Sequence, residues 1–382
     1  PAMEQFILIL AVVLGIGFSV GLFFLLHFCL PDRSFSEREN RVMQEAPRFT
    51  FSELFSGRFM TKFEKYMSDQ FPARDAWTTL KARAEVAQGK QENKNVYLCP
   101  TELGPLDYML IERFDAPEDS VIEKNVSALN TLCEATDGEV YFALIPGAGE
   151  ICEDVLPSDA PMDSQCAVIE KAYALSEAKT VDVFGALDAH DGEYLFYGTD
   201  HHWTSRGAYY GYTAFAQAMG FEARPISDFE VETVTTEFYG TTYSSSGFSW
   251  VQPDHIERWV QQGKNVSITN YPAGSPVEGS LYEDSFLAKK DKYASFLGGN
   301  TPQLVVETGL ADKPKLLIVR DSYMDSALPF LLEDFSEIHM IDLRYFRTSL
   351  LEYIAENEID QVLVCYSVAN FSTDANLFLL GL

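Results

Sequence analysis

The chain has 382 residues, of which 47% are hydrophobic and 13% aromatic, enough for one large domain or two modest ones. Its formal net charge is −29, and so acidic a surface repels phosphate backbones, which excludes nucleic acid from the expected partners. None of the six cysteines forms a Cys-x-x-Cys pair, which argues against a zinc knuckle. Cys152 and Cys166 could form a disulfide outside the cell; the alternative is that both are buried free thiols.

The first predicted element is a transmembrane anchor over residues 5–30. Phe6 to Leu30 is an almost unbroken apolar run, and about 20 such residues span a bilayer. A buried core helix is a poorer interpretation because the run has no polar face, and a signal peptide is poorer because no convincing cleavage site follows. Arg33, Arg38 and Arg41, just after the run, favour the cytoplasmic side under the positive-inside rule.

Residues 31–94 are expected to form a juxtamembrane linker and amphipathic helices. The stretch Pro31 to Arg41 is rich in Ser, Glu and Arg, as is typical of a linker. Four side chains then recur at helical spacing: Phe59, Phe63, Tyr66 and Met67. This helix is expected to end near Pro72, and a second helix to run from about Asp75 to Gln88. We interpret the aromatic stripe as a packing surface rather than a ligand site.

Residues 95–382 are expected to form an α/β domain, because short apolar runs alternate with helical patterns. The predicted strands are Val140–Pro146, Thr180–Phe184, Lys315–Val319, Glu337–Asp342 and Gln361–Tyr366. The predicted helices are about Met162–Ala178, Arg206–Met219, Asp325–Asp334 and Ser349–Asn357. This alternation predicts right-handed crossovers and a parallel sheet flanked by helices, with ligands at the carboxyl ends of the strands. Ser322 and Ser367 both lie just past such an end.

Residues 221–300 interrupt the alternation and are expected to form an insertion of hairpins and loops. The segment holds many Gly, Ser and Tyr residues and no long helical pattern. Its bulky aromatic residues include Phe238, Tyr239, Tyr243, Phe248, Trp250 and Trp259. Aromatic side chains on loops can stack on sugar rings or pack inside the fold, and the sequence leaves both interpretations open.

Two remote segments carry the residue types of acyl-transfer chemistry. Asp200 precedes His202 by two residues, and alternate residues of an extended segment point the same way, so the two side chains could share a face. Ser322 lies at a strand-to-helix turn, which exposes its hydroxyl beside a backbone N–H. A serine hydroxyl needs an imidazole as base, and the imidazole needs a carboxylate to fix its tautomer. Ser322, His202 and Asp200 are therefore the predicted nucleophile, base and orienting acid.

Each of these residues also has a plainer interpretation. Asp200 and the histidines could form a hydrogen-bond network at the entry to a helix, and Ser322 could simply cap the helix that follows it. Gly299 and Asn300 are candidate oxyanion-hole donors, although Gly-Gly-Asn commonly marks a turn.

The pentad Thr199-Asp200-His201-His202-Trp203 makes the chain resemble the DHHW family, which is similar to alginate-type acetyltransferases with SGNH-hydrolase-like domains. The resemblance covers nearly all of the chain after the anchor. Further matching phrases are Phe35–Arg41, Asp69–Arg74, Phe238–Thr241, Lys290–Tyr293, Phe296–Asn300, Arg320–Tyr323 and Asp342–Phe346. It implies an SGNH-hydrolase-like catalytic domain over 95–382, with 221–300 as an insertion and the roles named above for Ser322, His202 and Asp200.

In two respects the chain departs from ordinary SGNH hydrolases. The Asp-x-His pair precedes the serine, which reverses their order. Arg320 stands where they have the glycine of Gly-Asp-Ser, which leaves the assignment of the oxyanion hole open. Candidate substrate-binding residues are Trp203, Arg320, Arg344 and Tyr345, although the arginines could equally brace the site through salt bridges.

The resemblance also implies a location and partners. It places the catalytic domain outside the cytoplasm, on a single-pass anchor in the cell membrane, and we prefer this side to the one that the arginines favour. It implies a polysaccharide substrate and a multi-pass membrane O-acyltransferase that supplies acetyl groups. No cofactor and no metal ion are expected.

The predicted function is therefore O-acetylation of a cell-surface polysaccharide through an acyl-enzyme. An acetyl esterase with the same triad is the first alternative, because hydrolysis and transfer share that intermediate. A non-catalytic glycan-binding or assembly subunit is the second. A metal enzyme that uses Asp200, His201 and His202 is the third, and it is disfavoured because adjacent histidines seldom chelate one ion well and no second Asp/His cluster is evident.

Overall fold

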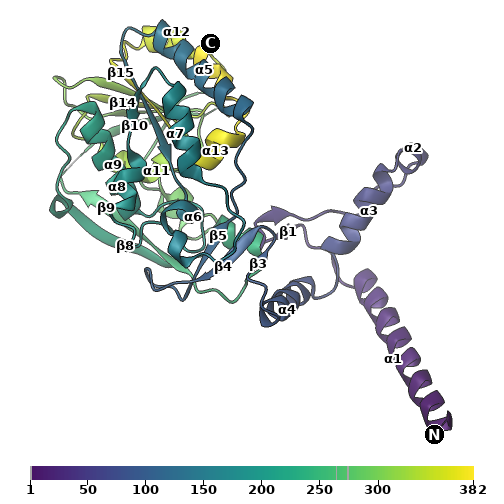
Figure 1. Cartoon of the computed structure of the whole chain (residues 1–382). Helices are drawn as coiled ribbons and strands as arrows, with labels where there is room; N and C mark the ends of the chain where they lie inside the picture. Colours follow the sequence, from purple (N-terminus) through teal and green to yellow (C-terminus); the bar gives the residue numbers. More distant parts are fainter. Residues whose placement is uncertain (1, 264, 273–274) are drawn as a thin grey trace. The chain divides into compact units, whose positions relative to one another are not determined.

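The computed structural model describes residues 2–263, 265–272 and 275–382. The chain divides into two compact units. The first comprises the chain up to Lys90 together with Gly247–Ser249, and the second comprises Gln91–Ser246 and Trp250–Leu382. Figure 1 shows the elements of both units, coloured along the sequence.

Helices dominate the first unit. α1 (Ala2–Cys29) covers the predicted anchor, and its segment Met3–Cys29 is long and apolar enough to cross a membrane. The other elements are β1 (Phe35–Ser36), β2 (Arg41–Val42), α2 (Phe51–Phe55), α3 (Arg58–Asp69) and α4 (Arg74–Ala87). α3 and α4 agree with the two amphipathic helices that the residue spacing predicts.

Local interactions define the ends of these helices. Thr50 caps α2, since its side chain accepts a hydrogen bond from the backbone N–H of Glu53. Gly57, with a φ of 78°, separates α2 from α3 in a conformation that favours glycine. Asp69 ends α3 and is buried, and its hydrogen-bonded ion pair with Arg41 at 2.6 Å lowers the pKa of Asp69 to about 2.

An eight-stranded sheet forms the centre of the second unit, in the order β11-β10-β12-β14-β13-β15-β6-β7. Neighbouring strands from β14 to β7 run parallel, whereas β12, β10 and β11 add an antiparallel edge. The strands are β6 (Glu139–Ile145), β7 (Lys179–Val181), β10 (Ser267–Tyr271), β11 (Val277–Glu278), β12 (Gln303–Glu307), β13 (Lys315–Arg320), β14 (Glu337–Ile341) and β15 (Gln361–Ser367). The prediction of an α/β fold with a largely parallel sheet is confirmed.

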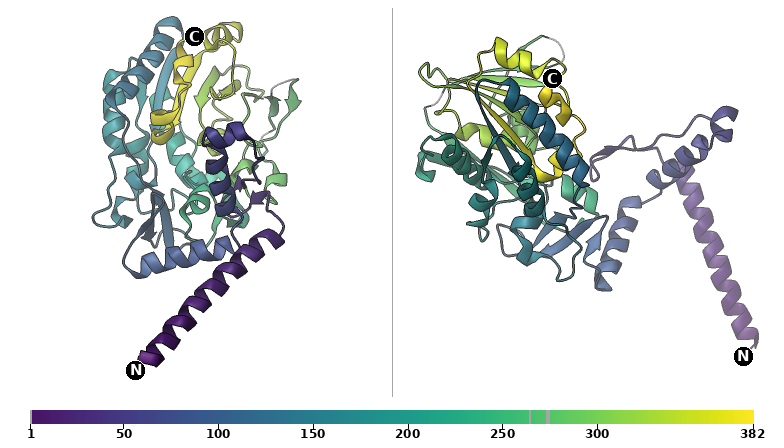
Figure 2. Two further views of the ribbon diagram at one scale, coloured as in Figure 1. Left: turned by 90° about the vertical axis from the view of Figure 1, so that its right-hand side faces the viewer. Right: turned by 45° about the horizontal axis from the view of Figure 1, so that its top comes forward.

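Helices cover both faces of this sheet (Figures 1 and 2). One face packs against α5 (Asp119–Ala135), α7 (Gln165–Leu175), α12 (Leu350–Glu356) and α13 (Val368–Thr373). The other packs against α8 (Val183–Asp188), α9 (Ser205–Met219) and α11 (Met324–Ala327). Alternate residues of β13 enter the two cores, with Leu317 and Val319 on the first face and Leu316 and Ile318 on the second. A strand buried on both faces explains why its sequence is a continuous apolar run.

Smaller elements complete the second unit. They are the antiparallel sheet β3 (Glu92–Asn93), β4 (Val96–Pro100) and β5 (Tyr108–Glu112), the hairpin β8 (Phe229–Phe238) and β9 (Asp254–Gln261), and the short helices α6 (Ala148–Ile151) and α10 (Thr241–Ser246). All six cysteines lie in the described ranges, and all are free thiols, Cys152 and Cys166 included.

The helix predicted over Asp325–Asp334 is shorter in the structure. It is only α11 followed by a 3₁₀ turn over Leu328–Phe330, because Pro329 has no N–H for a continuing α-helix. The segment 221–300 also contributes β10 and β11 to the edge of the main sheet.

Truncation of a side chain in the core between β13 and α9 tests this packing. Ile318→Ala should lower the free energy of unfolding by about 2–5 kcal/mol, because Ile318 is fully buried and the substitution leaves a cavity. Chemical unfolding of the full chain in detergent measures the difference. Val231→Ala on the exposed surface of β8 is the control, with an expected change within about 0.5 kcal/mol. Equal losses in both variants would contradict the assignment of this core.

Candidate active site

Ser322 lies two residues after the end of β13, at the carboxyl edge of the parallel sheet. The turn that presents it is held by Asp321, whose carboxylate accepts hydrogen bonds from the backbone N–H and hydroxyl of Ser367, both at 2.8 Å, and from the Asn370 side chain at 2.7 Å. The other oxygen of Asp321 accepts from the backbone N–H of Tyr323 at 3.0 Å. Asp321 therefore ties the serine turn to the end of the neighbouring strand β15. Ser322 itself remains partly exposed.

The segment that carries Asp200 and His202 is fixed by a second buried carboxylate. Asp254, at the start of β9, accepts hydrogen bonds from the backbone N–H groups of Gly198 and Thr199 at 2.9 and 2.7 Å and from the hydroxyls of Thr199 and Tyr194. Burial raises the pKa of Asp254 to about 6, although these hydrogen bonds act in the opposite direction. The strand β9 thus sets the path of the chain just before Asp200.

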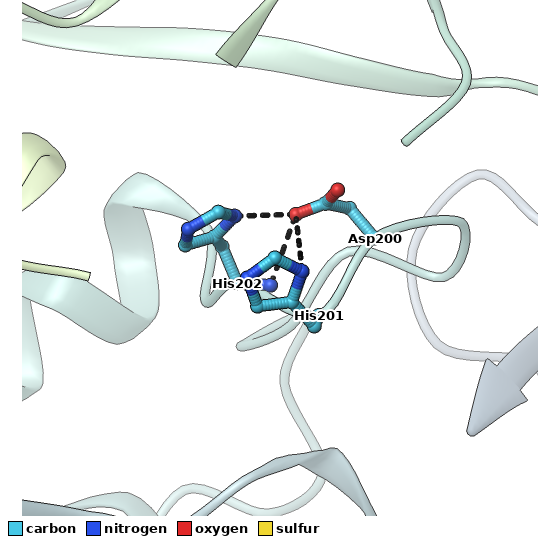
Figure 3. A group of neighbouring side chains, drawn as sticks. All are labelled: Asp200, His201 and His202. Carbon is cyan, nitrogen blue, oxygen red and sulfur yellow. Dashed lines mark hydrogen bonds and ion pairs between the residues drawn. The ribbon is translucent and has the colours of Figure 1, made fainter. Parts of the chain in front are cut away.

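The three predicted triad residues lie within hydrogen-bonding distance of one another. His202 Nδ1 lies 2.5 Å from Asp200 Oδ1, and His202 Nε2 lies 2.7 Å from Ser322 Oγ. An ionised carboxylate only accepts, so Nδ1 carries the proton and Nε2 is left to accept from the serine hydroxyl. Figure 3 shows one oxygen of the Asp200 carboxylate facing both His202 and His201, whose rings lie beside each other. The arrangement is that of a nucleophile, a base and a group that orients the base.

Asp200 is buried, and its hydrogen bonds come from His202 in its own loop and from Thr241 at the start of α10. Besides His202 Nδ1, Oδ1 accepts from the backbone N–H of His202 at 3.0 Å, and Oδ2 accepts from the N–H and hydroxyl of Thr241 at 2.8 and 3.0 Å. Burial alone would raise the pKa of Asp200, but the two histidines and these donors hold it well below its usual range. The carboxylate is therefore ionised at neutral pH.

His202 is enclosed by Tyr293. The two rings stack with centroids 3.7 Å apart and planes 8° apart. The tyrosine hydroxyl donates to the carbonyl of Ser322 at 3.0 Å and lies 3.1 Å from the hydroxyl of Ser326. Burial lowers the pKa of His202, and the neighbouring His201 lowers it further, while Asp200 acts to raise it. The net decrease keeps the imidazole neutral at pH 7, which is the state that a general base needs.

His201 does not join the relay. Its Nδ1 lies 2.6 Å from the hydroxyl of Thr241, which itself donates to Asp200, and its carbonyl accepts from the hydroxyl of Tyr323. Asp200, His201 and His202 lie close enough together to hold a metal ion. The Nδ1 atoms of both histidines are engaged in hydrogen bonds, and His202 Nε2 faces Ser322.

A cleft opens beside the triad. Asp200, His201, Tyr323, Gln165 and Ser367 are among the residues that line it, whereas Ser322 and His202 do not. The cleft therefore borders the carboxylate end of the relay rather than the serine hydroxyl.

Two candidate substrate-binding residues are buried in the structure. Trp203 is 0% exposed, and its indole N–H is shared between the carbonyl of Tyr323 at 2.9 Å and the hydroxyl of Ser326 at 3.0 Å. Arg320 is 1% exposed and forms an ion pair with the buried Asp325 at 2.8 Å. Both side chains brace the serine turn from inside, because their polar ends face protein groups, and neither presents a surface to a substrate.

The other candidate substrate-binding and oxyanion-hole residues differ in their exposure and contacts. Arg344 is half-buried and holds Asp342 through two side-chain hydrogen bonds at 2.9 and 2.7 Å, while Tyr345 is exposed. Gly299 has a φ of 90° and is part of a turn, and Asn300 is exposed. Within the described residues, neither Gly299 nor Asn300 lines the cleft or forms a recorded hydrogen bond to Ser322. Their role in an oxyanion hole stays a prediction.

Four residues that support the relay were assigned no role from the sequence: Thr241, Asp254, Tyr293 and Asp321. Thr241 and Tyr293 belong to phrases that carry the family resemblance, and Asp321 directly precedes the serine. The position of these three residues in or beside the matching phrases was a sequence signal that could have identified them as part of the site. Asp254 had no such signal, because its role depends on the pairing of β9 with β8.

The fold is an α/β fold with a largely parallel sheet flanked by helices, and the predicted triad lies at the carboxyl edge of that sheet. The chain matches the family described as DHHW protein over residues 108–341, which is more than half of its length, and it belongs to that family. No curated protein matches the chain.

Solved structures share this fold. A DHHW family protein from Eubacterium siraeum has a TM-score of 0.67 at 23% identity, over 75% of this chain and 95% of that one. PatB1 from Bacillus cereus, solved with a sulfonyl adduct, has a TM-score of 0.62 at 20% identity, over 74% of this chain and 98% of that one. A weaker likeness, with a TM-score of 0.46 and 13% identity, is to the O-acetyltransferase domain of Pseudomonas putida AlgJ, over 73% of this chain and 93% of that one.

Because Gly240 has no side chain, the Asp200 carboxylate can lie against the backbone at residue 240. A Cβ atom at residue 240 would lie 2.2 Å from Asp200 Cβ and 2.3 Å from its Oδ2. Gly240→Ala should therefore displace Asp200 and slow the reaction of Ser322 with a serine-directed probe by about 100-fold. Gly192→Ala is the control, since a Cβ there meets open space. Unchanged labelling of Gly240→Ala would show that the position of Asp200 does not matter.

The pH dependence of the same labelling reaction reports the state of His202. Because the pKa of His202 is lowered, the midpoint of the fall in rate at acid pH should lie below about 6.5, the ordinary value for histidine. In Asp200→Asn the midpoint should fall further, because a group that raises the pKa is lost, and the plateau rate should drop by about 10⁴-fold. A midpoint above about 6.5 in the unmodified chain would contradict this environment for His202.

Proposed function

We propose that the chain is a membrane-anchored, extracytoplasmic O-acetyltransferase that modifies a cell-surface polysaccharide. The observation that carries the proposal is the continuous hydrogen-bonded path from Asp200 through His202 to the hydroxyl of Ser322. The partial exposure of Ser322 and the burial of the other two residues support it further, because a nucleophile must meet its substrate while a base is best shielded from water.

In the first half-reaction, Ser322 Oγ attacks the carbonyl carbon of an acetyl donor while its proton passes to His202 Nε2. The tetrahedral intermediate collapses, the bond to the donor's oxygen breaks, and that oxygen takes the proton from His202. Asp200 stabilises the imidazolium that forms between these steps and keeps its Nδ1 hydrogen in place. The product is an acetyl ester on Ser322.

In the second half-reaction, a sugar hydroxyl replaces the donor. His202 Nε2 takes the proton of this hydroxyl, whose oxygen attacks the acetyl carbon on Ser322. When the second tetrahedral intermediate collapses, Ser322 Oγ leaves and recovers the proton from His202. The acetyl group is then an ester of the polysaccharide, and the enzyme has returned to its starting state.

An acetyl esterase with the same residues differs only in the second acceptor, which is water instead of a sugar hydroxyl. We favour transfer because the proposed anchor keeps the domain beside a membrane, where a multi-pass O-acyltransferase is the proposed source of acetyl groups. Polymer that gains acetyl ester in the presence of the enzyme supports transfer, and polymer that loses ester supports hydrolysis.

A non-catalytic glycan-binding subunit would leave the relay unused. Of the aromatic residues in the insertion, Phe238, Phe248 and Trp259 are buried in the fold and therefore present no surface to a glycan. A metal-dependent reaction at Asp200, His201 and His202 is also disfavoured, since both ring nitrogens of His202 already have partners in Asp200 and Ser322. Activity that a chelator abolishes and a divalent ion restores would favour the metal reaction instead.

Replacement of the nucleophile tests the proposal. The full chain should react with a sulfonyl fluoride at Ser322 and should transfer acetyl from an activated ester to a polysaccharide, and Ser322→Ala should lose both reactions to background. Ser367→Ala is a matched control at the end of the neighbouring strand, where a weakened Asp321 contact should lower the rate without abolishing labelling at Ser322. Equal labelling of the unmodified chain and Ser322→Ala would end the serine mechanism.

A further inference from the structure

The segment between the anchor and the sheet differs in charge from the rest of the chain. Residues 31–90 contain eleven Lys and Arg against nine Asp and Glu, whereas residues 91–382 contain 17 against 47. Anionic lipid headgroups therefore repel the strongly acidic surface of residues 91–382, but they do not repel the nearly neutral segment 31–90.

The same segment exposes far more large apolar side chains than the second unit does. Those in residues 31–90 are Phe35, Val42, Phe49, Phe51, Phe55, Met60, Phe71, Trp77 and Leu80. The much longer described part of residues 91–382 exposes only Leu175, Ile226, Val231, Val277, Tyr345, Phe378 and Leu382. Phe51 and Phe55 are 70% and 85% exposed, which is costly for aromatic rings in water.

α3 shows which side of this segment is apolar. Phe59, Met60, Phe63 and Met67 fall on one face at helical spacing, and Thr61 lies on the opposite face with the charged residues of the helix. Aromatic contacts extend this face in both directions, from Phe49 to Phe59 at 5.3 Å and from Phe63 to Tyr66 at 6.4 Å.

Contacts with α1 fix the depth of this surface. The ring of Tyr66 lies 5.4 Å from that of His27. Phe23 stacks on Phe71 at 5.3 Å and meets Trp77, at the start of α4, edge-on at 5.9 Å. Phe23 precedes the end of α1 by about 9 Å along the helix axis, at about 1.5 Å per residue. A hydrocarbon core of about 30 Å that begins at Phe6 takes about 20 residues and still contains Phe23.

We propose that α3 and the start of α4 lie in the interfacial layer of the bilayer, with Phe71 and Trp77 inserted beside α1 and the apolar face of α3 turned toward the acyl chains. The occupant of this surface is lipid, because side chains that pack against Phe23 share its depth and the segment carries no acidic excess. The inference rests on anchorage by α1, which is part of the proposed function. The protein would then bind the membrane through this apolar surface as well as through the single helix α1.

Tryptophan quenching by brominated phosphatidylcholine tests the proposal in vesicles that contain the full chain. Trp77 should account for most of the quenching, so Trp77→Phe should lose it while Trp250→Phe keeps it. In the Trp77→Phe background, Met60→Trp should gain quenching, and Thr61→Trp, one residue on but on the polar face, should not. Both sites are exposed, so neither substitution disturbs a core.

Phe18→Trp in the same background reports the anchor alone, because Phe18 lies in the middle of α1. Quenching at Phe18→Trp without quenching at Met60→Trp and Trp77 overturns the interfacial surface, leaves the anchor in place, and assigns the apolar face to a protein partner. Absence of quenching at Phe18→Trp overturns the anchor itself.

Discussion

The buried carboxylate of Asp200 is the constraint on which the site depends. An ionised group removed from water is stable only when it is fully hydrogen-bonded, and Asp200 obtains its partners from its own loop and from Thr241 in the insertion. Those donors keep the carboxylate charged, and the charge fixes the proton on His202 Nδ1. The lone pair at His202 Nε2 is therefore directed at Ser322. If Asp200 became protonated, His202 and Ser322 would no longer be held in this orientation.

Three separate packing interactions bring this arrangement together. Asp254 fixes the chain before Asp200, Asp321 ties the serine turn to β15, and Tyr293 stacks on the face of His202. Asp254 and Asp321 each accept several hydrogen bonds while buried, and they therefore hold the two segments in fixed positions. The segment 221–300 is thus part of the framework of the candidate site, since it supplies Asp254, Thr241 and Tyr293.

The sequence predicted the fold well wherever a strand is buried on both faces. The continuous apolar runs at Lys315–Val319 and Gln361–Tyr366 are strands because both of their faces meet helices, and parallel strands place their carboxyl ends at one edge. The Asp-x-His and Asp-Ser phrases predicted the residues that meet there. Sequence reasoning could not anticipate the burial of Trp203 or the role of Asp254, because both follow from how remote strands and helices pack. It also overlooked Pro329, a local signal that does shorten the predicted helix.

The most direct test of the relay is the detection of its covalent intermediate. The full chain is mixed with an activated acetyl ester, quenched rapidly in acid, digested, and examined by mass spectrometry. One acetyl group on the peptide that contains Ser322, present in the unmodified chain and strongly reduced in His202→Ala, is the result that the account predicts. An acetyl group at another residue, or equal acetylation of Ser322 with and without His202, would contradict it.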